Sequence, residues 1–162
     1  MTVTDVRKDP DTLTLTITAT FDAPLKRVWQ IWEDPRQLER WWGPPTYPAT
    51  VVEHDLRAGG RVTYFMTGPE GDRHHGWWSV RSVDGPHSLE FDDGFADEQG
   101  TPNTAMPTTV IRVALRATGE ETTEMIVTST FPSRATMEQL IAMGMLEGII
   151  AAAGQIPQVL AA

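Results

Sequence analysis

The chain has 162 residues, of which 40% are hydrophobic, and carries a formal net charge of −9 at pH 7 with a pI near 4.8. This length suits one domain, residues 1–162, that buries on the order of 70% of the surface of its unfolded chain. The acidic balance opposes nucleic acid as the main partner, because a phosphate-binding face needs clustered Lys and Arg. The absence of cysteine excludes disulfides, thiolate nucleophiles and Cys-ligated metals.

The distribution of apolar residues along the chain indicates where in the cell the protein is expected. The first eleven residues contain no apolar run, and nowhere are there enough consecutive apolar residues to span a bilayer. A cysteine-free composition fits a reducing compartment. We therefore expect a cytoplasmic protein with no membrane span.

The first predicted element is a strand. Apolar residues alternate with threonines from Leu13 to Phe21, the period-two pattern of a strand with one buried face. Two short helices should follow this strand. Val28, Trp29 and Trp32 have helical spacing, and Pro35 stands in the first turn of the next helix.

Large rings and backbone breakers are concentrated after these helices. Trp41 and Trp42 precede Gly43-Pro44-Pro45, so the pair is expected to form one wall of a shaped interior. The segment from Asp55 to Gly60 reads Asp-Leu-Arg-Ala-Gly-Gly and predicts a turn whose glycines supply backbone angles that other residues resist.

An antiparallel meander is predicted next. Its strands are separated by Gly- and Pro-containing turns, a longer loop is expected over Phe95 to Pro107, and Gly119-Glu120 joins the last two strands as a hairpin. The predicted strands are Thr46 to Leu56, Arg61 to Thr67, Gly76 to Val83, Ser88 to Asp92, Thr108 to Ala117 and Thr122 to Phe131.

The C-terminal segment is predicted to be a long helix that starts near Ser133 and is kinked or ended by Pro157. It is apolar around most of its circumference, so it must be covered on more than one side. Trp77 and Trp78, as neighbours on a strand, should point to opposite faces of the sheet. The helix and the outward ring together suggest a homodimer.

The joint pattern resembles a known family. Besides the tryptophan segment and Asp55-x-Arg57-x-Gly59-Gly60, the late Gly144-Met145-x-Glu147-Gly148 contributes to the resemblance. The chain is similar to the activator of heat-shock protein 90 ATPase homologue-like family of the START/Bet v 1-like (SRPBCC) superfamily. Ile149 departs from the family pattern, which commonly has Trp after the second glycine.

The resemblance implies an α+β helix-grip fold: a curved antiparallel sheet around a long C-terminal helix, with two short helices after the first strand. Such folds generally enclose an apolar cavity, so we expect a hydrophobic small molecule as the partner and no cofactor. Methionine and aromatic side chains offer adaptable apolar surface. The candidate ligand-binding residues are Trp41, Trp42, Met66, Trp78, Phe91, Met106, Met143 and Met145.

Two other functions stay open. A polyketide cyclase- or hydrolase-like enzyme would need an inward acid/base pair, for which the available residues are Arg61, Tyr64, Glu90, Asp92 and Arg112. A co-chaperone is disfavoured, because the eukaryotic co-chaperone of the family carries a separate chaperone-binding domain for which this chain has no room.

No catalytic or metal-binding motif is recognised in the sequence. His54, His74, His75 and His87 are expected to be exposed turn residues, and adjacent His74 and His75 should face opposite ways on an extended chain. Glu90 and Asp92 share one strand face, which is more typical of a solvated surface than of a catalytic pair. We therefore assign no catalytic residue and no metal ligand.

Overall fold

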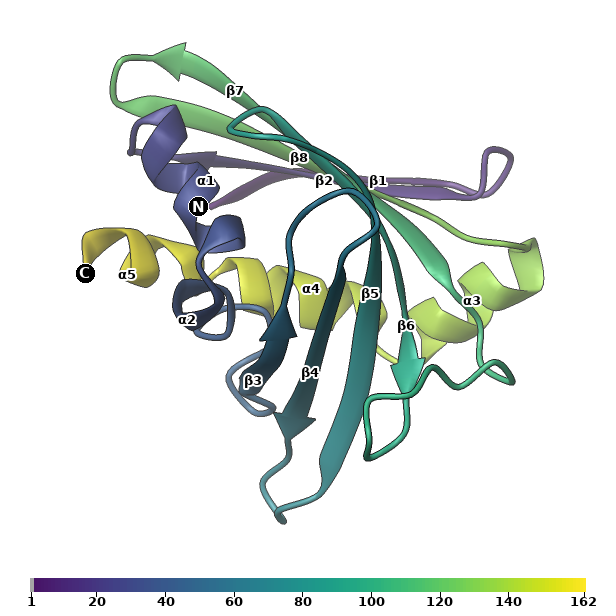
Figure 1. Cartoon of the computed structure of the whole chain (residues 1–162). Helices are drawn as coiled ribbons and strands as arrows, with labels where there is room; N and C mark the ends of the chain where they lie inside the picture. The colour runs from purple at the N-terminus through teal and green to yellow at the C-terminus, as the bar shows by residue number, and fades with distance from the viewer. Residues whose placement is uncertain (1) are drawn as a thin grey trace.

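The computed structural model describes residues 2–162, whose strands form one eight-stranded antiparallel sheet in the order β1-β2-β8-β7-β6-β5-β4-β3. The sheet curves strongly, and α4 crosses its inner side (Figure 1). The strands are β1 (Val3–Asp9), β2 (Thr14–Phe21), β3 (Ala49–His54), β4 (Arg61–Thr67), β5 (Arg73–Asp84), β6 (Ser88–Ala96), β7 (Thr109–Gly119) and β8 (Thr122–Thr130). The helices are α1 (Leu25–Glu33), α2 (Pro35–Leu38), α3 (Arg134–Ala142), α4 (Met145–Ala153) and α5 (Ile156–Ala161).

This arrangement confirms the predicted helix-grip class, and every predicted strand is present. One strand was missed. β1 forms a hairpin with β2 at the sheet edge, and Asp9 Oδ1 accepts the backbone N–H of Asp11 in its turn. β1 has only one buried side chain, Val3, so backbone pairing holds it without an apolar face that the sequence would reveal. The two short helices therefore follow the second strand, not the first.

The C-terminal helical segment is divided, which corrects the prediction of one long helix. The Ser133 hydroxyl caps α3 by accepting the Thr136 N–H at 3.1 Å. Gly144, with φ of +93°, separates α3 from α4, because that backbone conformation ends a right-handed helix and suits glycine. Pro157 lies in the first turn of α5, where its missing N–H costs no hydrogen bond. The second break thus comes before the proline.

Tryptophan rings occupy the centre of the core. Trp32 of α1 is fully buried and packs edge-on against Trp41, with ring centroids 4.8 Å apart. The Trp41 indole N–H donates to the Ile31 carbonyl oxygen at 3.0 Å, which ties the segment after α2 to α1. These contacts place α1 and α2 over one end of the curved sheet, where they close the interior (Figure 1).

The turn between β3 and β4 has the predicted form. The Arg57 and Gly60 backbone N–H groups donate to Asp55 and Arg57 carbonyl oxygens, respectively, and Gly59 has φ of +83°. Gly60 is needed for a different reason, because a Cβ there would overlap the carbonyl oxygen of Asp55.

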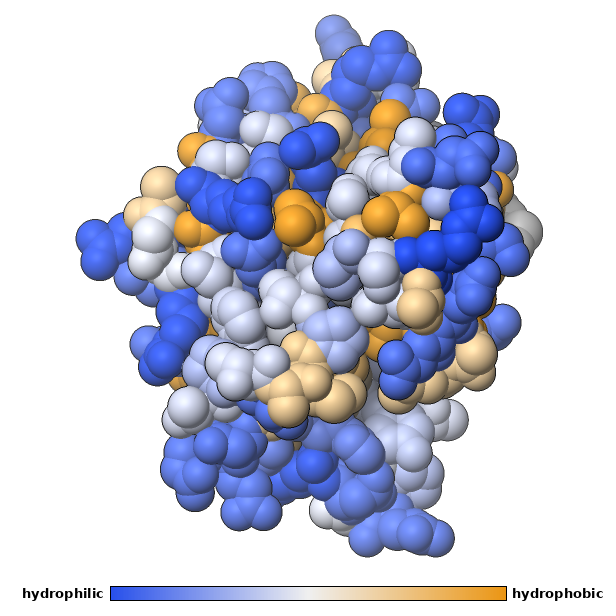
Figure 2. All heavy atoms as spheres, turned by 90° about the vertical axis from the view of Figure 1, so that its right-hand side faces the viewer, coloured by the Kyte–Doolittle hydropathy of each residue, from blue (hydrophilic) through white to orange (hydrophobic). Residues whose placement is uncertain are grey.

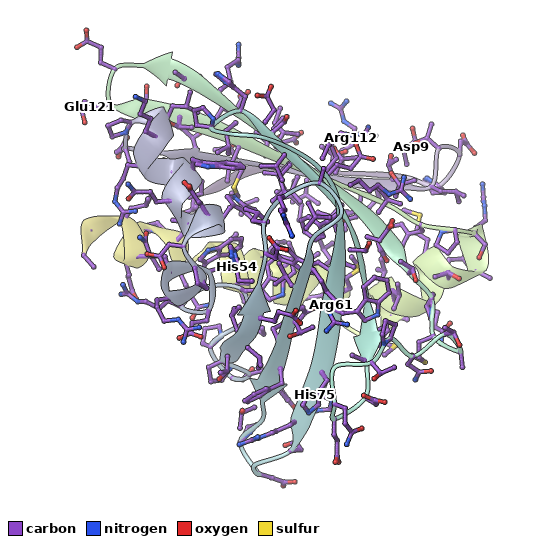
Figure 3. The ribbon with its side chains drawn as sticks, viewed as in Figure 1. Asp9, His54, Arg61, His75, Arg112 and Glu121 are labelled. Atoms are coloured by element: carbon purple, nitrogen blue, oxygen red, sulfur yellow. The ribbon has the colours of Figure 1, made fainter. Side chains whose placement is uncertain are left out.

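The outer face of the sheet carries cross-strand ion pairs. Arg81 and Asp92 approach to 2.9 Å, and Arg112 reaches Glu90 at 3.3 Å. Figure 3 shows Arg112 and Arg61 on the side away from α4. Glu90 and Asp92 therefore share a solvated face, as their alternation predicted, and the arginines are not inward. Exposed pairs of this kind contribute about 0 to 1 kcal/mol each.

In the described part of the chain, neither the surface on the side of α3 nor any single helix is strongly apolar over a long stretch (Figure 2). The face of the molecule on the side of α3 is mostly hydrophilic, with separate apolar spots (Figure 2). Within residues 2–162, no single helix is long and apolar enough to cross a membrane. α3 together with α4 and α5 has the length and composition of a span only as a pair of segments bent by 63°.

Candidate functional site

An apolar hollow lies between the sheet and α4. Its volume is about 260 Å³, and its walls come from the tryptophan segment, the inner faces of five strands and one side of α4. The residues around it are Ile17, Trp32, Trp41, Trp42, Pro44, Tyr64, Met66, Asp93, Ile111, Met125, Val127, Ser129, Met145, Gly148, Ile149, Ala152 and Ala153. We call this space the inner hollow.

A second space of about 360 Å³ adjoins the inner hollow on the side of α3, and we call it the outer hollow. The two share Tyr64, Met66, Asp93 and Met145 as lining residues. The break at Gly144 also borders the outer hollow. These four shared side chains therefore stand between the interior of the sheet and the more open space beside α3.

Five of the eight candidate ligand-binding residues line these spaces. Trp41 and Trp42 line the inner hollow, Met143 lines the outer hollow, and Met66 and Met145 line both. Because Met143 is 64% exposed, most of its side chain faces outward. Trp41, Trp42, Met66 and Met145 therefore lie beside a common space.

The other three candidates line neither hollow, so their prediction as lining residues is corrected. Trp78 and Phe91 are fully buried and stack on each other, with centroids 3.9 Å apart and planes inclined by 18°. Trp42 lies between them and the inner hollow, its ring centroid 4.9 Å from that of Trp78. Met106 lies in the connection between β6 and β7. Inward orientation alone did not distinguish packed core from cavity wall.

Trp77 and Trp78 do point to opposite faces, as predicted. The Trp77 ring lies over Gly94, where a Cβ would approach the indole to 2.8 Å, and its N–H donates to the Phe95 carbonyl oxygen at 2.9 Å. The outward ring is therefore partly covered by its own chain. This reduces the exposed apolar surface that suggested a homodimer.

A polar pair interrupts the apolar wall. The Tyr64 hydroxyl of β4 donates to Asp93 Oδ1 of β6 at 3.0 Å, across the intervening strand β5. Gly76 of β5 lies opposite Tyr64 in the sheet register, and a Cβ there would overlap the phenol ring. The glycine therefore leaves the space in which Tyr64 crosses β5 to reach the carboxyl group.

Burial shifts both groups of this pair. Desolvation raises the pKa of Asp93 to about 7, opposed by the hydrogen bond from Tyr64, which stabilises the ionised carboxylate. The pKa of Tyr64 is raised well above its usual value, first by desolvation and then by the charge of Asp93. Trp42 lies close enough to lower the Tyr64 pKa, although its indole N–H makes no hydrogen bond of good geometry. A carboxyl group that titrates near neutrality at a cavity wall is suited to proton exchange or polar recognition.

Sequence reasoning named Tyr64 but missed Asp93. The predicted strand ended at Asp92, whereas β6 continues to Ala96. Leu89, Phe91 and Asp93 alternate along β6, which places the acid on the inward face with two buried apolar residues. Extending the predicted strand by one residue would have revealed an acid on the apolar side.

Histidines do not form a metal centre. His74 and His87 are exposed, but His54 and His75 are half-buried, which corrects the expectation that all four are exposed. His54 Nε2 lies 3.0 Å from the Trp32 carbonyl oxygen, between β3 and the helices (Figure 3). Among residues 2–162, no group of three or more His, Asp or Glu side chains is arranged to hold a metal ion.

The curved sheet, its inner helix and the hollow between them define a helix-grip protein. The profile of the family described as Activator of Hsp90 ATPase homolog 1-like protein matches residues 22–161. The chain belongs to this family, as the resemblance implied. No protein of curated function matches the chain.

Solved structures agree with this assignment. Protein Ms6760 from Mycobacterium smegmatis is 52% identical, with a TM-score of 0.89, and the match covers 98% of this chain and 96% of that one. A protein from Arthrobacter aurescens is 50% identical, with a TM-score of 0.94 and coverage of 99% and 92%, respectively. One from Staphylococcus epidermidis is 26% identical, with a TM-score of 0.83 and coverage of 97% and 93%.

Proposed function

We propose that the protein binds a small hydrophobic molecule in the inner hollow, without a metal or nucleotide cofactor. The observation that carries the proposal is the open space beside α4. Gly148 faces this space, and a Cβ there would meet no atom within 4 Å. An apolar hollow of about 260 Å³ with a few polar groups has the composition of small-molecule sites, and its volume is slightly below their usual range, which begins at about 300 Å³.

Filling the hollow tests the proposal. Gly148→Phe should place a ring in the inner hollow and weaken binding of an environment-sensitive hydrophobic probe at least about tenfold. Folding should be retained, because glycine is less favourable than Phe in a helix interior and the added ring meets open space. Gly144 is less suitable for this test, because its φ of +93° would strain any side chain.

Ala151→Phe provides the matched control. Ala151 lies on the exposed side of the same helix, so the same ring should leave probe binding unchanged. Thermal unfolding of both variants and of the wild type would establish that each is folded. Probe affinity that is the same in the wild type and in folded Gly148→Phe would contradict binding in the inner hollow.

An acid/base enzyme is the second candidate, and one observation favours it. Asp93, rather than the outward Glu90 or Asp92, is the carboxyl group that reaches the hollow. The hydrogen bond from Tyr64 engages one oxygen of Asp93, and the other accepts no hydrogen bond from a side chain that the structure describes. Turnover that is abolished by Asp93→Asn, while binding is retained, would favour catalysis over binding alone.

The assembly and location of the protein also remain proposals. The apolar C-terminal helices support a homodimer, although Trp77 is partly covered within the chain. The cysteine-free composition supports a cytoplasmic location. The first proposal is tested by solution mass and the second by fractionation of cells.

A further inference from the structure

The inner hollow has an uneven distribution of polar groups. Its lining is apolar except near Tyr64, Asp93 and Ser129, and neither hollow includes an Arg or Lys among its lining residues. Asp93 therefore has no cationic partner in the wall. His74 and His75 line only the outer hollow, and His74 is already paired with Asp72 at 2.6 Å.

Asp93 has one satisfied oxygen and one that is open. Oδ1 accepts the Tyr64 hydroxyl, whereas Oδ2 has no hydrogen bond from any side chain that the structure describes. The Asp93 side chain is half-buried, and Oδ2 is not among the fully buried polar atoms without a partner, so water in the hollow can reach this oxygen. A ligand hydroxyl that enters the hollow would replace this water and donate its own hydrogen bond to Oδ2.

We propose that the ligand is an apolar, ring-bearing molecule with a hydroxyl group that donates a hydrogen bond to Asp93 Oδ2. This inference rests on the proposed function, binding of a small hydrophobic molecule in the inner hollow. The rings Trp41 and Trp42 supply the surface for the apolar body. The carboxyl group supplies the polar contact that fixes its orientation. Tyr64 is a positioning residue, because its hydrogen bond fixes the carboxyl group.

The same geometry disfavours acidic ligands. A fatty acid or aromatic acid would bring a second carboxylate to a wall without Arg or Lys. The formal net charge of −9 adds a repulsive field of the same sign. The chemical class that fits is therefore an uncharged alcohol or phenol with a compact apolar body, and not an apolar carboxylate.

Three naphthalene probes test this class, since they share one apolar body. 2-Naphthol donates a hydrogen bond, 2-methoxynaphthalene does not, and 2-naphthoate is anionic. Calorimetric titration of the full chain at neutral pH should find 2-naphthol bound about tenfold more tightly than 2-methoxynaphthalene, a difference of about 1.4 kcal/mol. 2-Naphthoate should bind most weakly.

Variants at Asp93 separate recognition from general affinity. Asp93→Leu should abolish the preference for 2-naphthol and retain binding of 2-methoxynaphthalene. Asp93→Asn, a second variant that keeps an acceptor for Tyr64, should reduce the preference because its amide N–H₂ offers donors. Asp92→Asn, on the outer face, should keep the preference near tenfold.

The outcomes distinguish this inference from the proposed function. Equal affinity of wild type for 2-naphthol and 2-methoxynaphthalene, a preference unchanged in Asp93→Leu, or strongest binding of 2-naphthoate would overturn the inference alone. No binding of any probe by folded wild-type protein would overturn both.

Discussion

Replacing Asp93 by Asn should make the protein more stable at alkaline pH, with little effect in acid. The pKa of Asp93 rises from 3.8 to about 7 on folding because the carboxyl group is desolvated. Below the lower value, the group is protonated in folded and unfolded chains alike. As pH rises, the unfolded chain releases the proton first, so the stability of the wild type falls until the folded group is also ionised.

The size of this effect follows from the two pKa values. One pKa unit corresponds to about 1.4 kcal/mol, so the shift from 3.8 to about 7 amounts to roughly 4 kcal/mol of lost stability above neutrality. This is an upper value, since water that enters the hollow solvates the ionised carboxylate. Asn keeps an acceptor for Tyr64, so the difference in acid should stay within about 1 kcal/mol.

Urea unfolding from about pH 5 to about pH 9, followed by tryptophan fluorescence, measures this difference. The free energy of unfolding of Asp93→Asn should exceed that of the wild type by an amount that grows with pH and levels off above about pH 7. Asp92→Asn is the neighbouring control and should change stability by less than about 1 kcal/mol, because Asp92 forms an outer ion pair. A wild-type-to-Asp93→Asn difference that is constant across this range would refute the reasoning.

Three further predictions concern the pair, the turn and assembly. Tyr64→Phe should raise the pKa of Asp93 further, because the substitution removes the hydrogen bond that lowers this pKa. Titration of the Asp93 carboxyl group by NMR measures the shift, and an unchanged pKa would contradict the role of the hydrogen bond. Gly60→Val should lower the free energy of unfolding by about 1 to 3 kcal/mol through collision with the Asp55 carbonyl, and unchanged melting would contradict the turn geometry. Light scattering at micromolar concentration should give about twice the monomer mass of 18.0 kDa, whereas a monomer mass would exclude the homodimer under those conditions.

The sheet was predictable wherever one face of a strand is apolar. β2 alternates clearly, whereas β4 was predicted with its observed bounds although its buried residues are consecutive. β1 failed this criterion, because Val6 is 37% exposed and only Val3 is buried. An edge strand that is held mainly by backbone hydrogen bonds leaves little hydrophobic signal.

The C-terminal helices show a different limit. Apolar composition correctly predicted helix across this region, but it could not locate the breaks. Gly144 has a left-handed backbone conformation at the start of α4, which the apolar pattern around it does not indicate. An apolar pattern indicates that a helix is buried, but it does not show at which residue the helix ends and the next one begins.

The candidate wall was only partly predictable, because packing divides inward side chains into two groups. Trp42 and Trp78 both face the interior, yet Trp42 lines the inner hollow and Trp78 is covered by Trp42 and Phe91. Strand alternation assigns a face, whereas depth depends on neighbouring strands and on α1. The spacing of residues in the sequence therefore does not predict whether an inward side chain lines the hollow or is covered by other side chains.

The Tyr64–Asp93 pair required information from three strands at once. Alternation places each residue inward on its own strand, but their meeting depends on the register that sets Gly76 opposite Tyr64. With any larger residue at that position, the phenol would be displaced from β5 and its hydroxyl from the carboxyl group. Glycine usually destabilises a strand, but Gly76 is required here because it leaves the space in which Tyr64 reaches Asp93. This dependence makes Gly76 as informative about the candidate site as either residue of the pair.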